Sequence, residues 1–224
     1  MTTTNEPPPP IRTPPIQGEP IRLAVCVSGG GTSLQNLIDR IADGKLDARI
    51  VQVIASRPGV GAIARAERAG IPVAVAGPSK GSPAEFSASV FDPIRASGAE
   101  LVLLAGFLAM VHIPEDFQGR VINIHPTLIP SFCGKGFYGQ RAHQAVLDYG
   151  AKVSGCTVHF ADDTYDTGPI ILQRAVPVLE TDDAAALAAR VFEEEREALP
   201  EAVALYAAGR LKIEGRRVIV SPPG

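Results

Sequence analysis

The strongest constraint on the fold is an alternation of short apolar runs and segments of helical periodicity that begins at Ile21. The apolar runs, rich in valine and isoleucine, predict strands at Ile21–Val27, Ile50–Ala55, Ile71–Val75, Glu100–Ala105 and Val121–Ile124. Helical spacing between them predicts helices at 34–41, Ala62–Ala69 and Pro83–Ser97, with Pro93 expected to kink or break the last. This alternation predicts an α/β fold: a mainly parallel, twisted sheet with helices on both faces and ligands at the strands' carboxyl ends.

The pattern changes near the C-terminus. The predicted strands Gly155–Phe160 and Ile170–Val178 are joined by the short loop 161–169. Parallel pairing needs a longer crossover, so this pair should extend the sheet in the antiparallel sense. We expect a single domain over residues 21–220, preceded by an extended or disordered proline-rich tail, 1–20, and followed by a short tail, 221–224.

Composition excludes several classes of protein. With 224 residues and 46% hydrophobic content, the chain can fill one sizeable core. A formal net charge of -3 gives no electrostatic case for nucleic acid or an anionic membrane, and no apolar run predicts a membrane span or signal peptide. Cys26, Cys133 and Cys156 are widely spaced, which indicates free thiols in a reducing compartment and no structural metal site. The expected location is the cytoplasm.

A glycine-rich loop, Ser28–Ser33, joins the first predicted strand to the first predicted helix. Glycine lets the backbone approach a ligand, and the unpaired N–H groups of a helix N-terminus attract anions. The loop lacks the Gly-Lys-Ser/Thr end of a P-loop, and Leu34 replaces the third glycine of a dinucleotide site. A terminal phosphomonoester fits best, although a tight turn without any ligand has the same pattern.

Two polar side chains mark the end of the fifth predicted strand. Asn123 and His125 are two residues apart, so they share one face of an extended backbone. An amide donor beside an imidazole suits a reaction in which an oxyanion develops while a proton moves. If Asp166 in the 161–169 loop reaches His125, it would set the imidazole tautomer and favour the protonated form. A strand that ends in a surface histidine would show the same residues.

Two further features leave alternatives open. The stretch Cys133–Gly139 contains three glycines and Lys135, which indicates either a loop that closes over a substrate or an ordinary surface loop. His143 falls in a helix predicted over Arg141–Tyr149 and is expected on the helix surface.

A set of short motifs, taken in order, resembles one protein family. The motifs are Ser28-Gly29-x-Gly31, Ala105-Gly106-Phe107, Asn123-x-His125-Pro126 with Leu128-x-Pro130, Gly155-x-Thr157-Val158-His159 and Asp166-x-Gly168-Pro169. Together they look like the phosphoribosylglycinamide formyltransferases, over a match from about Ile21 to Val220. The resemblance implies a single-domain, Rossmann-like formyltransferase fold.

The resemblance also implies a reaction. The formyl group of the cosubstrate 10-formyltetrahydrofolate would pass, without a metal, to the amine of glycinamide ribonucleotide in de novo purine (IMP) biosynthesis. By analogy, Asn123 and His125 would stabilise the oxyanion, and Asp166 would support His125. The residues that bind the ribonucleotide would be Gly30, Gly31, Thr32, Ser33 and Glu195. The residues that bind the folate would be Leu108, Ala109, Met110, Val111, Asp162 and Asp163. The implied partners are these small molecules, not nucleic acid or membrane, and the protein would be a monomer or homodimer.

The chain departs from the family pattern at two places. Many members carry Met-Arg-Ile or Met-Arg-Leu after Gly-Phe, whereas Ala109 occupies the arginine position here, which affects contacts to the outer part of the folate. Ser33 stands where asparagine is common, which bears on the phosphate site.

Three other functions remain open. A formyltetrahydrofolate hydrolase shares the same three polar residues but normally has an N-terminal regulatory domain, which twenty proline-rich residues cannot form. A transfer-RNA formyltransferase would need a further C-terminal domain. From another class, the chain could be a nonenzymatic nucleotide- or folate-binding protein of the same fold.

Overall fold

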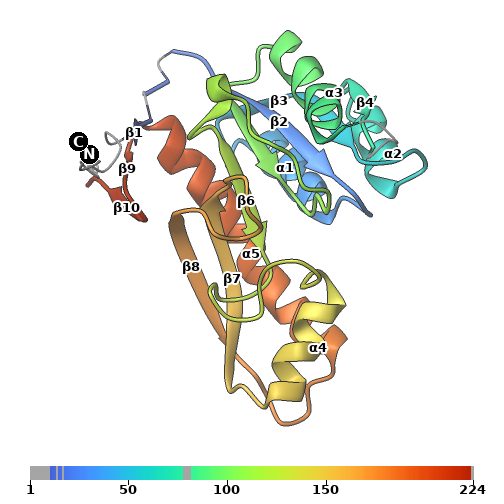
Figure 1. Cartoon of the computed structure of the whole chain (residues 1–224), viewed down its shortest axis with the longest axis vertical. Helices are drawn as coiled ribbons and strands as arrows, with labels where there is room; N and C mark the ends of the chain where they lie inside the picture. The colour runs from blue at the N-terminus through green and yellow to red at the C-terminus, as the bar shows by residue number, and fades with distance from the viewer. Residues whose placement is uncertain (1–10, 14, 17, 78–81, 223–224) are drawn as a thin grey trace, which may run out of the picture.

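A computed structural model describes residues 11–13, 15–16, 18–77 and 82–222 (Figure 1). Its strands are β1 (Ile11–Arg12), β2 (Ile21–Val27), β3 (Ala48–Ala55), β4 (Val73–Val75), β5 (Leu101–Leu104), β6 (Val121–His125), β7 (Val153–Phe160), β8 (Ile170–Pro177), β9 (Leu211–Glu214) and β10 (Arg217–Val220). Its helices are α1 (Thr32–Ala42), α2 (Gly61–Arg68), α3 (Pro83–Ala96), α4 (Gln140–Tyr149) and α5 (Ala184–Ala207), with a short 3-10 turn at Glu115–Phe117.

In the described part of the chain, the strands form one ten-stranded sheet in the order β1-β9-β10-β8-β7-β6-β5-β2-β3-β4. In the half of the sheet that runs from β6 through β5, β2 and β3 to β4, every pair of neighbouring strands is parallel. β7 then pairs antiparallel with β6, and β8 antiparallel with β7. The predicted α/β fold, with a mostly parallel sheet and an antiparallel C-terminal extension, is confirmed.

Helices cover both faces of the sheet. In the central strand β2, Leu23 and Val25 belong to one core cluster while Ala24 and Cys26 belong to the other, because successive side chains of a strand point to opposite faces. The helices α1, α2 and α5 pack on the first cluster, and α3 packs on the second. Burial on both sides explains why the parallel strands consist mainly of apolar residues.

Of the two outcomes predicted at Pro93, a kink or a break, the break does not occur, because α3 runs through the proline in one helix. The helix starts with a capping box in which the Ser82 hydroxyl accepts from the Glu85 N–H and the Glu85 carboxylate accepts from the Ser82 N–H. Phe91 and Ile94, on either side of the proline, are fully buried. Capping and burial together outweigh the one donor that proline removes.

The first described residues are not a free tail. β1 pairs antiparallel with β9, the Thr13 N–H donates to the Leu211 carbonyl at 3.1 Å, and the Ile16 N–H donates to Ala207 at 2.9 Å. Disorder is therefore the wrong prediction for this stretch, since the edge of a sheet accepts a proline-flanked segment. The predicted N-terminal tail also includes residues 1–10, 14 and 17, which lie outside the described residues. The same holds for residues 223–224 of the predicted C-terminal tail.

Candidate active site

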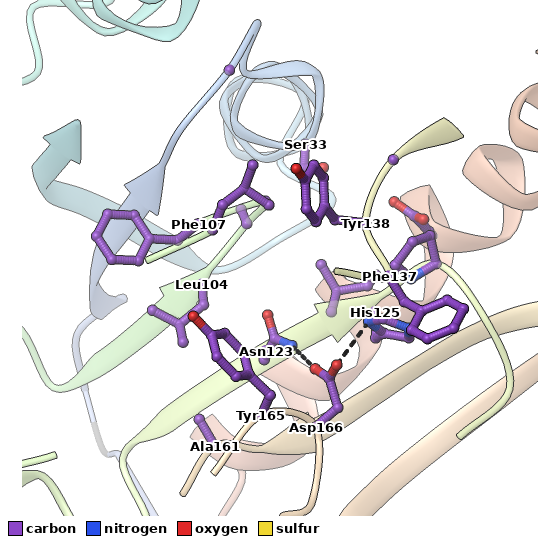
Figure 2. Close-up of a pocket in the computed structure, with 18 of the residues that line it drawn as sticks. Ser33, Leu104, Phe107, Asn123, His125, Phe137, Tyr138, Ala161, Tyr165 and Asp166 are labelled. Carbon is purple, nitrogen blue, oxygen red and sulfur yellow. Dashed lines mark hydrogen bonds and ion pairs between the residues drawn. The ribbon is translucent and has the colours of Figure 1, made fainter. Parts of the chain in front are cut away.

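A cavity of about 840 Å³ opens where the parallel strands β2, β5 and β6 end (Figure 2). Its walls come from the segments that follow these strands, from α4 and α5, and from the loop after β7. All the predicted catalytic and ribonucleotide-binding residues line it: Gly30, Gly31, Thr32, Ser33, Asn123, His125, Asp166 and Glu195. The structure therefore gathers residues from four separate segments at the edge where α/β sheets bind ligands.

The glycine loop and the N-terminus of α1 form one end of the cavity. Gly31 adopts a left-handed conformation with φ of 75°, and a Cβ there would lie 2.7 Å from the Cβ of Ala62. Only glycine fits this position without displacing α2. Across the loop, the Leu108 N–H donates to the Ser28 hydroxyl at 3.0 Å, which ties the loop to the segment after β5. The predicted anion site thus has a fixed backbone.

The end of β6 carries Asn123 and His125 on the cavity side, as predicted from their spacing. Register with β7 places His159 directly opposite Asn123. The amide nitrogen of Asn123 lies 3.0 Å from His159 Nε2 and 3.3 Å from Asp166 Oδ1. In the unliganded site the Asn123 amide thus contacts this cluster, and its donation of a hydrogen bond to a ligand stays a prediction.

His125 is almost fully buried between two acceptors. Its Nε2 lies 3.1 Å from the Phe132 carbonyl and its Nδ1 lies 3.5 Å from Asp166 Oδ2. A carbonyl cannot donate, so Nε2 carries a proton that points toward Phe132. Burial lowers the pKa of His125, and the opposing effect of Asp166 does not offset it. Asp166 thus favours the protonated form, as expected, but desolvation has the larger effect on the pKa of His125.

Asp166 joins the cluster from the loop after β7. It is one of the few non-glycine residues with positive φ, at 56°, and its Oδ2 accepts a hydrogen bond from the Gly134 N–H at 2.7 Å. Burial by itself would raise the pKa of Asp166, but contacts with His159, His125 and Gly134 outweigh it and lower the pKa. The surroundings thus favour the ionised form of Asp166 and the neutral form of His125.

Of the run of acidic residues in α5, Glu195 is the one that lines the cavity. Glu193 pairs with Arg196 at 3.2 Å and Glu194 with Arg174 at 3.4 Å, whereas no described residue gives Glu195 a hydrogen bond or an ion pair. By accessible surface Glu195 is only half-buried, yet its surroundings are apolar enough that burial raises its pKa to about 7. The choice of Glu195 as the inward-facing carboxylate is confirmed.

His143 corrects the sequence prediction of a surface residue. It is 3% exposed, lines the cavity, and its Nδ1 has no hydrogen-bond partner among the described residues. Burial lowers the pKa of His143, and the nearby His125 lowers it further. A signal existed in the sequence: Ala142 and Val146 mark the buried side of α4, and a residue three positions before Val146 shares that side.

The segment after β5 forms the opposite wall. Leu108–Val111, predicted to contact a folate, all line the cavity. Asp162 lines it as well, although its carboxylate accepts hydrogen bonds from the Thr167 hydroxyl. Asp163 is not among the lining residues: its carboxylate accepts from the Ile113 N–H at 2.8 Å. The Asp163 carboxylate thus anchors the segment after β5, and its contact with a ligand stays a prediction.

The loop Cys133–Gly139 covers part of the cavity mouth. Lys135, Phe137 and Tyr138 line the cavity (Figure 2). The Gly134 N–H bond to Asp166 joins this loop to the polar cluster. It is therefore not a remote surface loop, and its closure over a ligand stays a prediction.

The fold and the cavity together define an α/β group-transfer enzyme, with an amide, an imidazole and a carboxylate at the end of the central strand. More particularly, the chain belongs to the formyl transferase family, whose sequence profile matches residues 21–203.

Individual relatives are similar to this chain over most of its length. A chloroplastic phosphoribosylglycinamide formyltransferase of Arabidopsis thaliana is 38% identical over 195 residues, which cover 85% of this chain and 67% of the relative. The trifunctional purine biosynthetic protein adenosine-3 of Gallus gallus is 40% identical over 88% of this chain, which spans only 20% of that protein. The crystal structure of glycinamide ribonucleotide transformylase 1 from Symbiobacterium toebii superposes with a TM-score of 0.84 at 41% identity, covering 92% of this chain and 96% of that one.

Two structural findings concern the described ranges alone. No helix there combines the length and apolar character that crossing a bilayer requires. No group of three or more His, Cys, Asp or Glu side chains there is arranged to hold a metal ion.

Proposed function

We propose that this protein transfers the formyl group of 10-formyltetrahydrofolate to the amine of glycinamide ribonucleotide, a step of de novo purine biosynthesis. The observation that carries the proposal is that one cavity combines an anion site at the α1 N-terminus with the Asn123, His125 and Asp166 cluster. The names of the relatives support the same substrates. At about 840 Å³, the cavity falls within the usual range for small-molecule sites.

The ribonucleotide would occupy the side of the cavity formed by α1 and α5. Its phosphate would be bound by the backbone N–H groups of the glycine loop and by the hydroxyls of Thr32 and Ser33. Glu195 has no other partner among the described residues and would accept hydrogen bonds from the ribose hydroxyls. This placement would bring the ribonucleotide's amine toward the end of β6.

The formyl donor would bind against Leu108–Val111, a wall with few polar side chains. With alanine at position 109, the outer part of the folate would have no arginine contact from this segment. Asp162 lines the cavity while its carboxylate also bonds Thr167. Of the six residues predicted to bind folate, the proposed contacts are therefore the five that line the cavity, Leu108–Val111 and Asp162.

The chemistry follows from the cluster. The amine nitrogen attacks the formyl carbon, the carbonyl oxygen becomes an oxyanion, and the bond from carbon to the folate nitrogen then breaks. The Nε2–H of His125 would donate to the oxyanion, which as a charged acceptor competes well with the Phe132 carbonyl. Asp166 would hold His125 in place and, through a water molecule, help carry the proton from the attacking amine to the leaving folate nitrogen.

The direct test supplies purified protein with glycinamide ribonucleotide and 10-formyltetrahydrofolate and follows the loss of the formyl donor. Turnover that requires the amine is the expected result. No turnover by folded protein would contradict the assignment, and ligand binding without turnover would indicate a nonenzymatic binding protein. Formate release at the same rate without the amine would indicate a hydrolase.

The cytoplasm is the proposed location, supported by the three free thiols Cys26, Cys133 and Cys156. A monomer or homodimer is the proposed assembly, which light scattering of the purified protein would distinguish.

A further inference from the structure

The helix α2 packs directly against the glycine loop, although none of the described residues that line the cavity comes from this helix. A Cβ at Gly61, the first residue of α2, would lie 3.4 Å from the Cα and the carbonyl oxygen of Gly30. A Cβ at Gly31 would lie 2.7 Å from the Cβ of Ala62 and 3.4 Å from the Cδ of Arg65. The proposed phosphate site is therefore built against α2, to which the proposed function assigns no role.

Two hydrogen bonds from α2 hold successive carbonyl groups of the loop. The backbone N–H of Ala62 donates to the Gly29 carbonyl at 3.2 Å, and Arg65 Nε donates to the Gly30 carbonyl at 2.8 Å. A carbonyl oxygen carries partial negative charge, so an unpaired carbonyl in this loop would repel a phosphate group. Both bonds therefore engage a group that would otherwise oppose the binding of an anion.

The direction of the Gly31 N–H follows from the bond to Arg65. In a trans peptide the C=O and the N–H of the same plane point in opposite directions. A Gly30 carbonyl that faces Arg65 therefore leaves the Gly31 N–H directed away from Arg65. Gly31 lines the cavity, and no described residue accepts a hydrogen bond from its N–H. This N–H is thus available to a phosphate oxygen.

Arg65 is itself held in place by α1. Its Nη1 donates to Gln35 Oε1 at 3.1 Å, and the side-chain amide of Gln35 donates to Asp39 Oδ1 at 2.8 Å. Arg65 forms no ion pair with a described carboxylate. Its positive charge therefore adds to that of the α1 N-terminus, where the phosphate is proposed to bind.

We propose that Arg65 is a positioning residue that turns the Gly30–Gly31 peptide so that the Gly31 N–H donates to the phosphate of the ribonucleotide. This inference rests on the proposed function, which puts a phosphate at the glycine loop. Arg65 is not among the residues that line the cavity, so it acts through the loop. Its effect should fall on the binding of the phosphate, because the reacting atoms lie at the end of β6.

The test measures steady-state kinetics of Arg65→Met with two acceptors, glycinamide ribonucleotide and its phosphate-free nucleoside. Methionine keeps an unbranched stem but cannot donate to the Gly30 carbonyl. We expect KM for the ribonucleotide to rise about tenfold, while kcat changes less than about twofold. For the nucleoside, kcat/KM should change less than about twofold, since it has no phosphate to contact the loop.

Two further variants serve as controls. Arg65→Lys can still donate to the Gly30 carbonyl and should recover part of the lost affinity. Arg68→Met, also on α2, removes a side chain that donates to the Ala64 carbonyl of the same helix at 3.1 Å, and it should alter neither acceptor's kinetics. Equal losses for both acceptors, or no loss for the ribonucleotide, would overturn the proposal, because a general disturbance of α2 affects both acceptors alike.

A second measurement needs no turnover. On addition of ribose 5-phosphate, the Gly31 amide proton of the wild-type protein should move downfield in the NMR spectrum, and it should move much less in Arg65→Met. No shift of Gly31 in the wild-type protein, or the same shift in both proteins, would overturn the proposal. If the wild-type protein shows this shift but transfers no formyl group, the proposed function fails while the role of Arg65 stands.

Discussion

Glu195→Gln should stabilise the protein, and by more at alkaline pH than at acid pH. Burial raises the pKa of Glu195 from 4.5 to about 7. Because the folded-state pKa lies above the unfolded one, the neutral carboxyl's contribution is complete below about pH 4.5 and is lost as the pH rises through about 7. The wild-type protein thus has to bury a charge at pH 8 that glutamine never carries.

The size of the effect follows from the same two pKa values. With about 1.4 kcal/mol per pKa unit, replacing the carboxyl with an amide should stabilise by at most about 1 kcal/mol at pH 5 and about 3 kcal/mol at pH 8. Glu195 is only half-buried, so partial solvation reduces both values. We expect the gain at pH 8 to exceed the gain at pH 5 by about 1–2 kcal/mol.

The assay is urea denaturation of both proteins at pH 5 and pH 8, with the free energy of unfolding extrapolated to water. Glu193→Gln is the matched control: this neighbour pairs with Arg196 in solvent and should shift stability by less than about 0.5 kcal/mol at either pH. A gain of the same size at both pH values, or a loss at pH 8, would refute the argument from burial. The gain in stability should be accompanied by weaker ribonucleotide binding if Glu195 holds the ribose.

Two further predictions concern the polar cluster. In steady-state kinetics, His125→Ala and Asp166→Asn should each lower kcat by orders of magnitude with less effect on ribonucleotide binding, because the pair acts mainly on the transition state. Equal losses in binding would argue against those roles. Gly168→Ala should lower both the melting temperature and kcat, since a Cβ at this position would lie 1.8 Å from the Phe160 carbonyl oxygen and force the Asp166 loop to move. A variant with wild-type melting temperature and turnover would show that the loop does not need this close approach.

Local signals were enough to predict the parallel half of the fold. The bounds of β2 match the predicted strand Ile21–Val27, and Gly150 ends α4 in a left-handed conformation as its position after Tyr149 suggested. In both cases the sequence signal and the physical cause lie within one element. The shared face of Asn123 and His125 belongs to the same category, because strand periodicity alone sets it.

The features that were missed depend on partners far along the chain. β1 exists because β9, about two hundred residues later, offers it an edge, and nothing in a proline-flanked Ile-Arg pair predicts this. The side chain of Asn123 contacts His159 on β7 and Asp166 in the loop after β7, and the residues around Asn123 in the sequence predict neither contact. The pKa of His125 depends on how deeply the site is desolvated, and the presence of an acidic neighbour in the sequence does not give that depth.

The reversal of strand direction at β6 brings residues from both halves of the chain to each proposed substrate. For the ribonucleotide, the proposed phosphate contacts precede β6 and Glu195 follows it; for the folate, Leu108–Val111 precede β6 and Asp162 follows it. The parallel half and the antiparallel half also meet where α5 packs on the same core cluster as α1, and the side-chain amide of Asn36 donates to the Arg196 carbonyl at 3.0 Å. Recognition of either substrate therefore depends on how the two halves pack against each other.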